Sequence, residues 1–134
     1  EAHYRGDIPL KEGVALYLDR LRRDGVRMCV ASATALPLMK ACLDRLGVLD
    51  YFDFLLSCEE VGWGKDRPDV YHEAARRLGA SPGEIAVYED ALGAAKTAKM
   101  AGYYVVAVYD GGTQPWEELK KLADEAIDNW KEEI

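Results

Sequence analysis

The sequence predicts an α/β domain in which helices cover both faces of a parallel sheet. Segments with helical periodicity alternate with short strand-like segments along most of the chain. The strand-like segments, such as VRMCVA at 26–31 and YVVAV at 104–108, are largely apolar on both faces. Strands of this kind are typical of parallel sheets buried between two layers of helices. A length of 134 residues suits one such domain and leaves no room for two.

The expected elements follow one another with short connections. Apolar residues at helical spacing mark each expected helix, and a glycine stands at or near its end, where it can adopt the left-handed backbone of a helix terminus. Pro68 suits a helix start because its missing N–H costs nothing there, and the segment 81–84 (SPGE) has the composition of a capping turn. The expected helices span 10–24, 35–46, 68–79 and 91–102, and the expected strands span 26–31, 53–57, 85–89 and 104–108.

From residue 116 onward the pattern allows two interpretations. Leu119, Leu122, Ile127 and Trp130 can lie along one amphipathic helix. Alternatively, a helix ends near residue 123 and is followed by a short edge strand and a last turn. Periodicity alone does not decide between the two.

Charge and composition disfavour several classes of protein. A formal net charge of −7 argues against a nucleic-acid-binding protein, which needs a basic surface. No apolar run has the length of a membrane span and no leader opens the chain, so we expect neither membrane insertion nor secretion. Cys29, Cys42 and Cys58 form no CxxC pair, so we expect free thiols in a cytoplasmic protein and no zinc site.

The first candidate site residues follow the expected strand 26–31. Ser32, Ala33 and Thr34 stand at its carboxyl end, directly before a helix, and ligands bind at this edge of parallel sheets. A hydroxyl beside the free N–H groups of a helix N-terminus is a ready anion site. The alternative is that Ser32 or Thr34 simply caps the helix.

Lys65 is the second candidate. It follows the strand 53–57 through a loop in which Trp63 has a glycine on either side, and it precedes the helix that starts at Pro68. A P-loop is excluded, because that motif would need glycine where Glu59 stands. Lys65 either reaches the edge of the sheet and neutralises an anion there, or is a solvated loop lysine.

Glu89 and Asp90 form the third candidate feature, at the end of the strand 85–89. Two adjacent carboxylates at the mouth of a buried sheet need a compensating cation, and Mg²⁺ prefers such oxygen ligands. The alternative is that Asp90 caps the helix that begins near Ala91. An anion site, a lysine and a carboxylate pair on one edge together predict that phosphate and Mg²⁺ bind there.

These motifs, in this order, resemble the haloacid dehalogenase superfamily of phosphotransferases, in its β-phosphoglucomutase/phosphoglycolate-phosphatase-like branch. MCVAS with Ser32, GKDRPDVY with Lys65 and IAVYED with Glu89 and Asp90 match three family motifs, and the resemblance runs from about Ile8 to Trp130. It implies a Rossmann-like three-layer α/β/α fold. It also favours a short strand at 125–128 over one long helix.

The sequence departs from the family in two places. The family's first motif, Asp-x-Asp at the end of a central strand, is absent. We therefore expect residues 1–9 to be a linker returning from a missing cap domain and 10–134 to be the core without its first strand, incomplete at the N-terminus. The missing N-terminal segment, or another chain, would complete the sheet. Residues 91–92 (AL) are apolar where relatives often carry a polar residue.

The resemblance implies a Mg²⁺-dependent phosphomonoester hydrolase that acts on a small phosphorylated metabolite through an aspartyl-phosphate formed on an upstream aspartate. Ser32, the Ala33 N–H and Lys65 would hold the phosphoryl group, and Thr34 would touch a second phosphate in a mutase. Asp90 with Glu89 would hold Mg²⁺. Residues 1–134 alone would then be inactive. The alternatives are a β-phosphoglucomutase-like phosphomutase, a non-catalytic phosphate-binding module and, as a weaker option, a dehalogenase.

Overall fold

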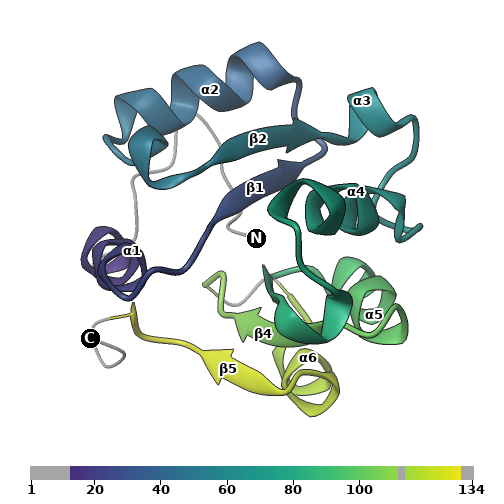
Figure 1. Ribbon diagram of the computed structural model, residues 1–134. Helices are drawn as coiled ribbons and strands as arrows, with labels where there is room; N and C mark the ends of the chain where they lie inside the picture. The colour runs from purple at the N-terminus through teal and green to yellow at the C-terminus, as the bar shows by residue number, and fades with distance from the viewer. Residues whose placement is uncertain (1–12, 112–113, 131–134) are drawn as a thin grey trace.

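The computed structural model describes residues 13–111 and 114–130. Helices and parallel strands alternate along this part of the chain (Figure 1). The helices are α1 (Val14–Arg23), α2 (Leu36–Arg45), α3 (Cys58–Val61), α4 (Asp69–Leu78), α5 (Leu92–Met100) and α6 (Trp116–Leu122). The strands are β1 (Cys29–Ser32), β2 (Phe54–Ser57), β3 (Ala86–Glu89), β4 (Tyr104–Val108) and β5 (Glu125–Ile127), and two 3-10 turns span Leu49–Tyr51 and Pro82–Glu84.

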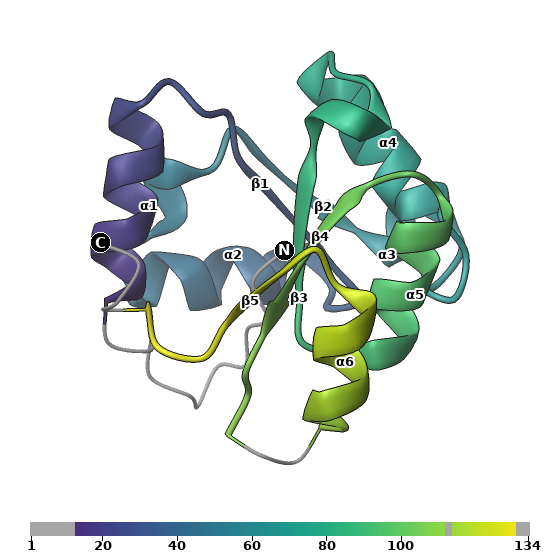
Figure 2. The same ribbon diagram turned by 90° about the horizontal axis from the view of Figure 1, so that it is seen from below.

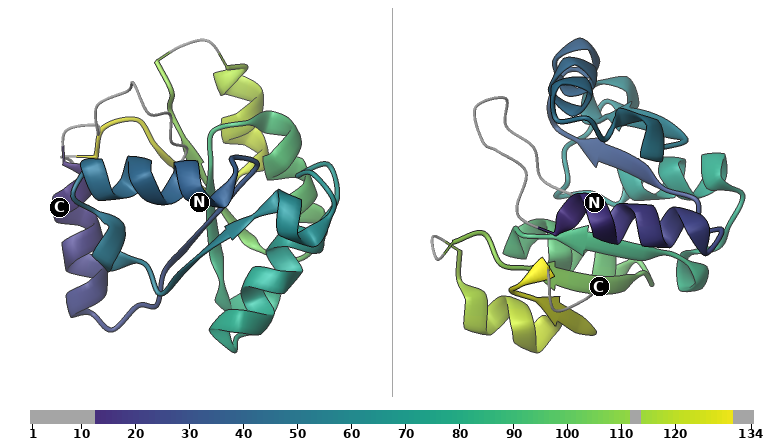
Figure 3. Two further views of the ribbon diagram at one scale, coloured as in Figure 1. Left: turned by 90° about the horizontal axis from the view of Figure 1, so that it is seen from above. Right: turned by 90° about the vertical axis from the view of Figure 1, so that its left-hand side faces the viewer.

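The strands form two separate hydrogen-bonded groups. β1 pairs with β2 in parallel, with Ser32 opposite Ser57. β3, β4 and β5 form a second parallel group in that order. Within the described residues no ladder joins β1 to β3, and two further views show the two groups as distinct (Figure 3).

Helices cover both faces of the strands (Figure 2). On one face α1 and α2 pack on a cluster that includes Val30 and Val106. On the other face α4, α5 and α6 pack on a cluster that includes Ala31 and Val105. Neighbouring residues of one strand thus enter opposite cores, because side chains alternate along a strand. This three-layer α/β/α arrangement confirms the predicted fold class.

All the expected elements within the described residues are present; the strand 104–108 has its predicted bounds, and most of the others are shorter than predicted. The expected strand 26–31 begins at Cys29 and includes Ser32, and α1 begins at Val14, while residues 10–12 of that expected helix lie outside the described residues. Ser81 and Glu84 form the predicted capping box. α3 and the turn at Leu49–Tyr51 were not predicted, because each is a single turn with too few residues to show a period.

The two interpretations of the C-terminal segment are resolved. α6 ends at Leu122 and β5 follows, paired in parallel with β4, so the single long helix is wrong. Asp124 stabilises the connection between α6 and β5. Its carboxylate accepts hydrogen bonds from the Val105 N–H at 2.8 Å and from Lys99 Nζ at 2.6 Å.

Two further expectations bear on the surface and the thiols. In the part of the chain that the structure covers, no helix is long and apolar enough to span a membrane. Cys42 and Cys58 are buried and Cys29 is half-buried, and all three are free thiols.

Candidate active site

The loop after β1 is organised by its own hydroxyl groups. The Thr34 N–H donates to Ser32 Oγ at 3.1 Å. α2 begins after Ala35, and among the described residues no side chain caps its N-terminus. The alternative that Ser32 or Thr34 caps this helix is therefore wrong. Ser32 and Thr34 are half-buried and Ala33 is exposed, so the loop has a solvent-facing side that an anion can reach.

Lys65 reaches the end of β3 across the strand edge. Its Nζ lies 3.0 Å from Glu89 Oε2, and its side chain is only 17% exposed. The alternative of a solvated loop lysine is therefore wrong. The turn before it is made by Gly62, which ends α3 with a left-handed backbone (φ 91°) that favours glycine.

Glu89 is a carboxylate buried at 2% exposure. Besides Lys65, its Oε2 accepts the Tyr71 hydroxyl at 3.2 Å, and its Oε1 accepts the Asp90 N–H at 3.3 Å. Burial by itself would raise the pKa of Glu89, but the Lys65 charge and the hydrogen bonds from Lys65 and Tyr71 outweigh burial and hold this pKa below its ordinary value. Glu89 is therefore an anion at neutral pH.

Asp90 stands half-buried at the carboxyl end of β3. α5 begins after Ala91, and within the described chain no side chain caps that helix, so the alternative of a capping Asp90 is wrong. Gln114 holds the Asp90 backbone in place, since its amide donates to the Asp90 carbonyl at 2.6 Å and to the Val108 carbonyl at 3.0 Å. Sequence reasoning missed Gln114, because no motif marks it.

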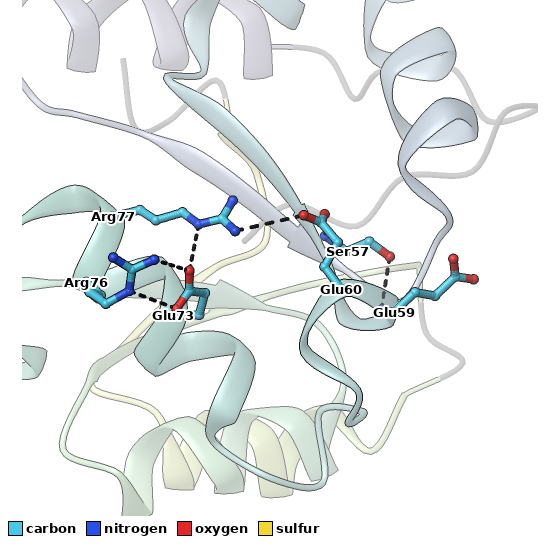
Figure 4. Close-up of polar contacts among 6 residues, drawn as sticks. All are labelled: Ser57, Glu59, Glu60, Glu73, Arg76 and Arg77. Atoms are coloured by element: carbon cyan, nitrogen blue, oxygen red, sulfur yellow. Dashed lines mark hydrogen bonds and ion pairs between the residues drawn. The ribbon is translucent and has the colours of Figure 1, made fainter.

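Ser57 connects the ends of β1 and β2. It is 1% exposed. Its Oγ donates to the Thr34 carbonyl at 2.9 Å. The same Oγ accepts the Glu59 N–H at 3.2 Å (Figure 4). Glu60 completes a capping box by accepting the Ser57 N–H at 2.9 Å. Sequence reasoning missed Ser57 and Glu60, although the S-x-x-E spacing of SCEE is the signal of such a box.

A row of ion pairs ties α3 to the second half of α4, and these two helices flank the loop that carries Lys65. Arg77 contacts Glu60 at 3.9 Å and Glu73 at 2.8 Å (Figure 4). Arg76 binds Glu73 as well, at 2.6 Å. Hydrogen bonds from Arg76 and Arg77 lower the pKa of Glu73 to about 2. Glu73 therefore remains charged through the neutral range.

Three contacts unite the loops that follow four strands. Ser57 joins the loop after β2 to the loop after β1, Lys65 joins the loop after α3 to the end of β3, and Gln114 joins the loop after β4 to Asp90. The candidate residues after β1, β2 and β3 therefore share one edge of the fold. Tyr71, buried on α4, is a fourth contributor that the sequence analysis missed.

The metal ligands at this edge are few. Among the described residues, no group of three or more histidine, cysteine, aspartate or glutamate side chains is placed to hold a metal ion. Asp90 and Glu89 offer the oxygen atoms that Mg²⁺ prefers. Both Glu89 oxygens already accept hydrogen bonds. Glu89 and Asp90 together therefore fit only part of the ligand set of a magnesium site.

A family model described as haloacid dehalogenase-like hydrolase matches residues 2–102. The chain belongs to this family. The matched stretch contains every candidate residue that the sequence predicts, from Ser32 to Asp90, and ends before α6.

Curated relatives of this haloacid dehalogenase-like chain include a phosphatase and a phosphoglucomutase by name. Protein CbbY of Cereibacter sphaeroides is 32% identical over 131 residues, which cover 95% of this chain and 56% of the relative. Hexitol phosphatase B of Escherichia coli is 31% identical, covering 74% and 46%, and beta-phosphoglucomutase of Bacillus subtilis is 29% identical, covering 76% and 44%. The chain thus spans about half the length of these relatives.

A solved structure agrees with the fold. A mutant of CbbY from Rhodobacter sphaeroides, in complex with xylulose-(1,5)bisphosphate, superposes with a TM-score of 0.81 at 30% identity. The match covers 96% of this chain and 57% of that one. The haloacid dehalogenase-like core is therefore the fold of this chain.

Proposed function

We propose that this chain is part of a Mg²⁺-dependent phosphomonoester hydrolase that acts on a small phosphorylated metabolite, such as a sugar phosphate, through an aspartyl-phosphate. The observation that carries the proposal is the buried Lys65–Glu89 ion pair, held at the same edge as Asp90 and the Ser32–Thr34 loop. Relatives named as phosphatases support the reaction class. The nucleophilic aspartate lies outside this chain, and the protein works in the cytoplasm.

The chain's own residues bind and orient the phosphoryl group. The Ser32 hydroxyl and the Ala33 N–H donate to its oxygens at the loop after β1. The Lys65 ammonium balances negative charge on the phosphoryl group and on the attacking carboxylate. Glu89 and Tyr71 keep Lys65 at the strand edge, because Glu89 holds Nζ at 3.0 Å and Tyr71 holds Glu89.

Asp90 would bind Mg²⁺ directly, and Glu89 would do so through a water molecule because its oxygens are engaged. Remaining ligands would come from the phosphate and from the segment that carries the nucleophile. A bound Mg²⁺ would neutralise charge on the phosphoryl oxygens during attack. Residues 1–134 alone would then hold part of a phosphate site without the group that attacks phosphorus.

A phosphomutase is the second candidate, favoured by the similarity to beta-phosphoglucomutase. In that case Thr34 would contact a second phosphate. A non-catalytic phosphate-binding module is the third. Analysis of products separates the three, because a hydrolase releases inorganic phosphate, a mutase yields an isomeric sugar phosphate and a binding module yields neither.

The test compares the natural polypeptide with residues 1–134 expressed alone. We expect an intact mass above 14.9 kDa for the natural polypeptide and Mg²⁺-dependent release of phosphate from p-nitrophenyl phosphate or a sugar phosphate. Lys65→Met should lower kcat/KM by about 100- to 1,000-fold, while Lys96→Met, at an exposed position of α5, should leave it unchanged. Turnover by residues 1–134 alone would contradict an external nucleophile, and inactivity of the natural polypeptide on every phosphomonoester would contradict the hydrolase.

A further inference from the structure

Gln114 is the only glutamine of the chain, and its half-buried side chain joins the ends of two strands. Its amide nitrogen donates to the Asp90 carbonyl at 2.6 Å and to the Val108 carbonyl at 3.0 Å. Its amide oxygen accepts the Asp110 N–H at 2.5 Å. A primary amide has two N–H donors and one carbonyl acceptor, so these three bonds use both donors and the oxygen. The reverse orientation would place the oxygen against two carbonyls, and the bonds therefore fix the direction of the amide.

These three bonds, the Gln114 bridge, lie where the pairing of β3 with β4 stops. The last pair in the register is Glu89 opposite Ala107. Asp90 and Val108 are the next residues on the two strands, and their carbonyls are joined by the Gln114 side chain. The bridge therefore holds the backbone of Asp90 at a point that the β3–β4 pairing does not reach.

The backbone of Asp90 is held by side chains on both of its polar groups. Its N–H donates to Glu89 Oε1 at 3.3 Å, and its carbonyl accepts from Gln114. The direction of a side chain follows from the backbone that carries it, so these bonds restrict where the Asp90 carboxylate points. Removing a group that orients a metal ligand from outside the ligand set typically weakens metal binding by about 10- to 100-fold. Gln114 occupies such a place relative to Asp90.

We propose that Gln114 is a positioning residue that sets the affinity of the Asp90 carboxylate for Mg²⁺. It acts through the backbone of Asp90 and is not itself a metal ligand. This inference rests on the proposed function, because that function places Mg²⁺ at Asp90. It gives a role to the loop after β4, in which the sequence marks no candidate residue.

Gln114→Met in the natural polypeptide tests this role. Methionine has a length similar to that of glutamine, but it has no N–H to donate to the two carbonyls. We expect the Kd for Mg²⁺, measured by isothermal titration calorimetry without substrate, to rise about 10-fold. Saturating Mg²⁺ should restore kcat close to that of the parent, because the residues that hold the phosphoryl group are unchanged. A general loosening of the site would instead lower kcat at every Mg²⁺ concentration.

Asp124→Ala is the matched control. Asp124 makes the same kind of bond from a side chain to the backbone of β4, since its carboxylate accepts the Val105 N–H at 2.8 Å. Val105 lies toward the amino end of β4, whereas the Gln114 bridge lies at the carboxyl end. We expect Asp124→Ala to lower Tm and to leave the Kd for Mg²⁺ unchanged. An unchanged Kd in Gln114→Met, or an equal rise in both variants, would overturn the proposal.

The side-chain amide protons of Gln114 give a second measurement, which needs no variant. Coupling between two sites is reciprocal, so Mg²⁺ bound at Asp90 should in turn stabilise the Gln114 bridge. We expect added Mg²⁺ to slow the exchange of these amide protons with solvent, as followed by NMR, and added Na⁺ at equal ionic strength to have no such effect. Exchange that does not respond to Mg²⁺ would overturn the proposal, and this measurement decides the point if Gln114→Met fails to fold.

The positioning role and the hydrolase fail in different ways. A raised Kd for Mg²⁺ in Gln114→Met, with no phosphatase activity in the natural polypeptide, would keep the positioning role and remove the hydrolase. Mg²⁺-dependent phosphatase activity, with an unchanged Kd in Gln114→Met, would do the reverse.

Discussion

The ion pair between Lys65 and Glu89 joins residues 24 positions apart and lies almost wholly out of water. A buried carboxylate is tolerated only when a charge and hydrogen bonds compensate its lost hydration. Lys65 supplies the charge, and Tyr71 and the Asp90 N–H supply the bonds. The pair therefore stabilises the folded core as well as the proposed phosphate site.

Lys65→Met should destabilise the protein by about 3 kcal/mol, because it leaves Glu89 buried and uncompensated. Urea denaturation of the variant measures the loss. Lys96→Met is the matched control at an exposed position, and its free energy of unfolding should stay within about 0.5 kcal/mol of the parent. The double variant Lys65→Met/Glu89→Gln should recover part of the loss. Equal stability of the two lysine variants would contradict the role of the buried pair.

The lowered pKa of Glu89 makes this contribution depend on pH in a known direction. A carboxyl whose pKa is lower in the folded state than its ordinary 4.5 stabilises the fold above that value and loses this effect as the pH falls below it. The difference in Tm between the parent and Glu89→Gln should thus be constant near neutrality and shrink below about pH 4.5. A difference that grows on acidification would contradict the assignment.

At the scale of elements, α3 is a single turn whose position depends on Ser57. This serine caps α3, joins the Thr34 carbonyl and is buried, whereas Ser81 forms a similar capping box at an exposed site. The two boxes share a motif and differ in burial. They provide a matched comparison within one chain.

Ser57→Ala should cost about 2 kcal/mol of stability, since it removes a cap from a buried site and leaves the half-buried Thr34 carbonyl without this donor. Ser81→Ala should cost about 1 kcal/mol or less. Chemical denaturation of both variants measures the two losses. If Ser81→Ala lowers the stability more than Ser57→Ala does, burial does not strengthen the contribution of the Ser57 capping box.

At the scale of the whole molecule, the described sheet has two groups of strands that share the cores but no ladder. β4 lies between β3 and β5, so both its edges are bonded. Ala86 of β3 instead directs its N–H away from β4, because the preceding Ile85 carbonyl accepts the Tyr104 N–H and these directions alternate along a strand. Local opening that exposes a backbone amide should therefore cost less free energy at Ala86 than in β4.

Native-state hydrogen exchange should show this difference by NMR. We expect the Ala86 amide to exchange at least about 100-fold faster than the Val105 amide, because Val105 lies in the central strand of its group and is fully buried. Equal protection of the two amides would contradict this difference between the strands.

Local sequence signals predicted most of the elements. Residues such as Leu18 and Met39 recur at helical spacing, and the strand 104–108 was predicted with its observed bounds, because periodicity and burial are encoded in neighbouring residues. α3 could not be found in this way, since one turn has no period. The choice of a strand after α6 came from the family resemblance, because the local pattern fitted a helix equally well.

By itself, the sequence determined the alternation of helices and strands and the candidates Ser32, Lys65, Glu89 and Asp90, since these follow from order along the chain. Only the tertiary structure excluded helix-capping roles for Ser32, Thr34 and Asp90. It brings Lys65 to Glu89, and it adds Tyr71, Ser57 and Gln114 from other elements. It also opens a cavity between β1 and β3. These are contacts between distant segments, and their energies depend on burial, which no local pattern records.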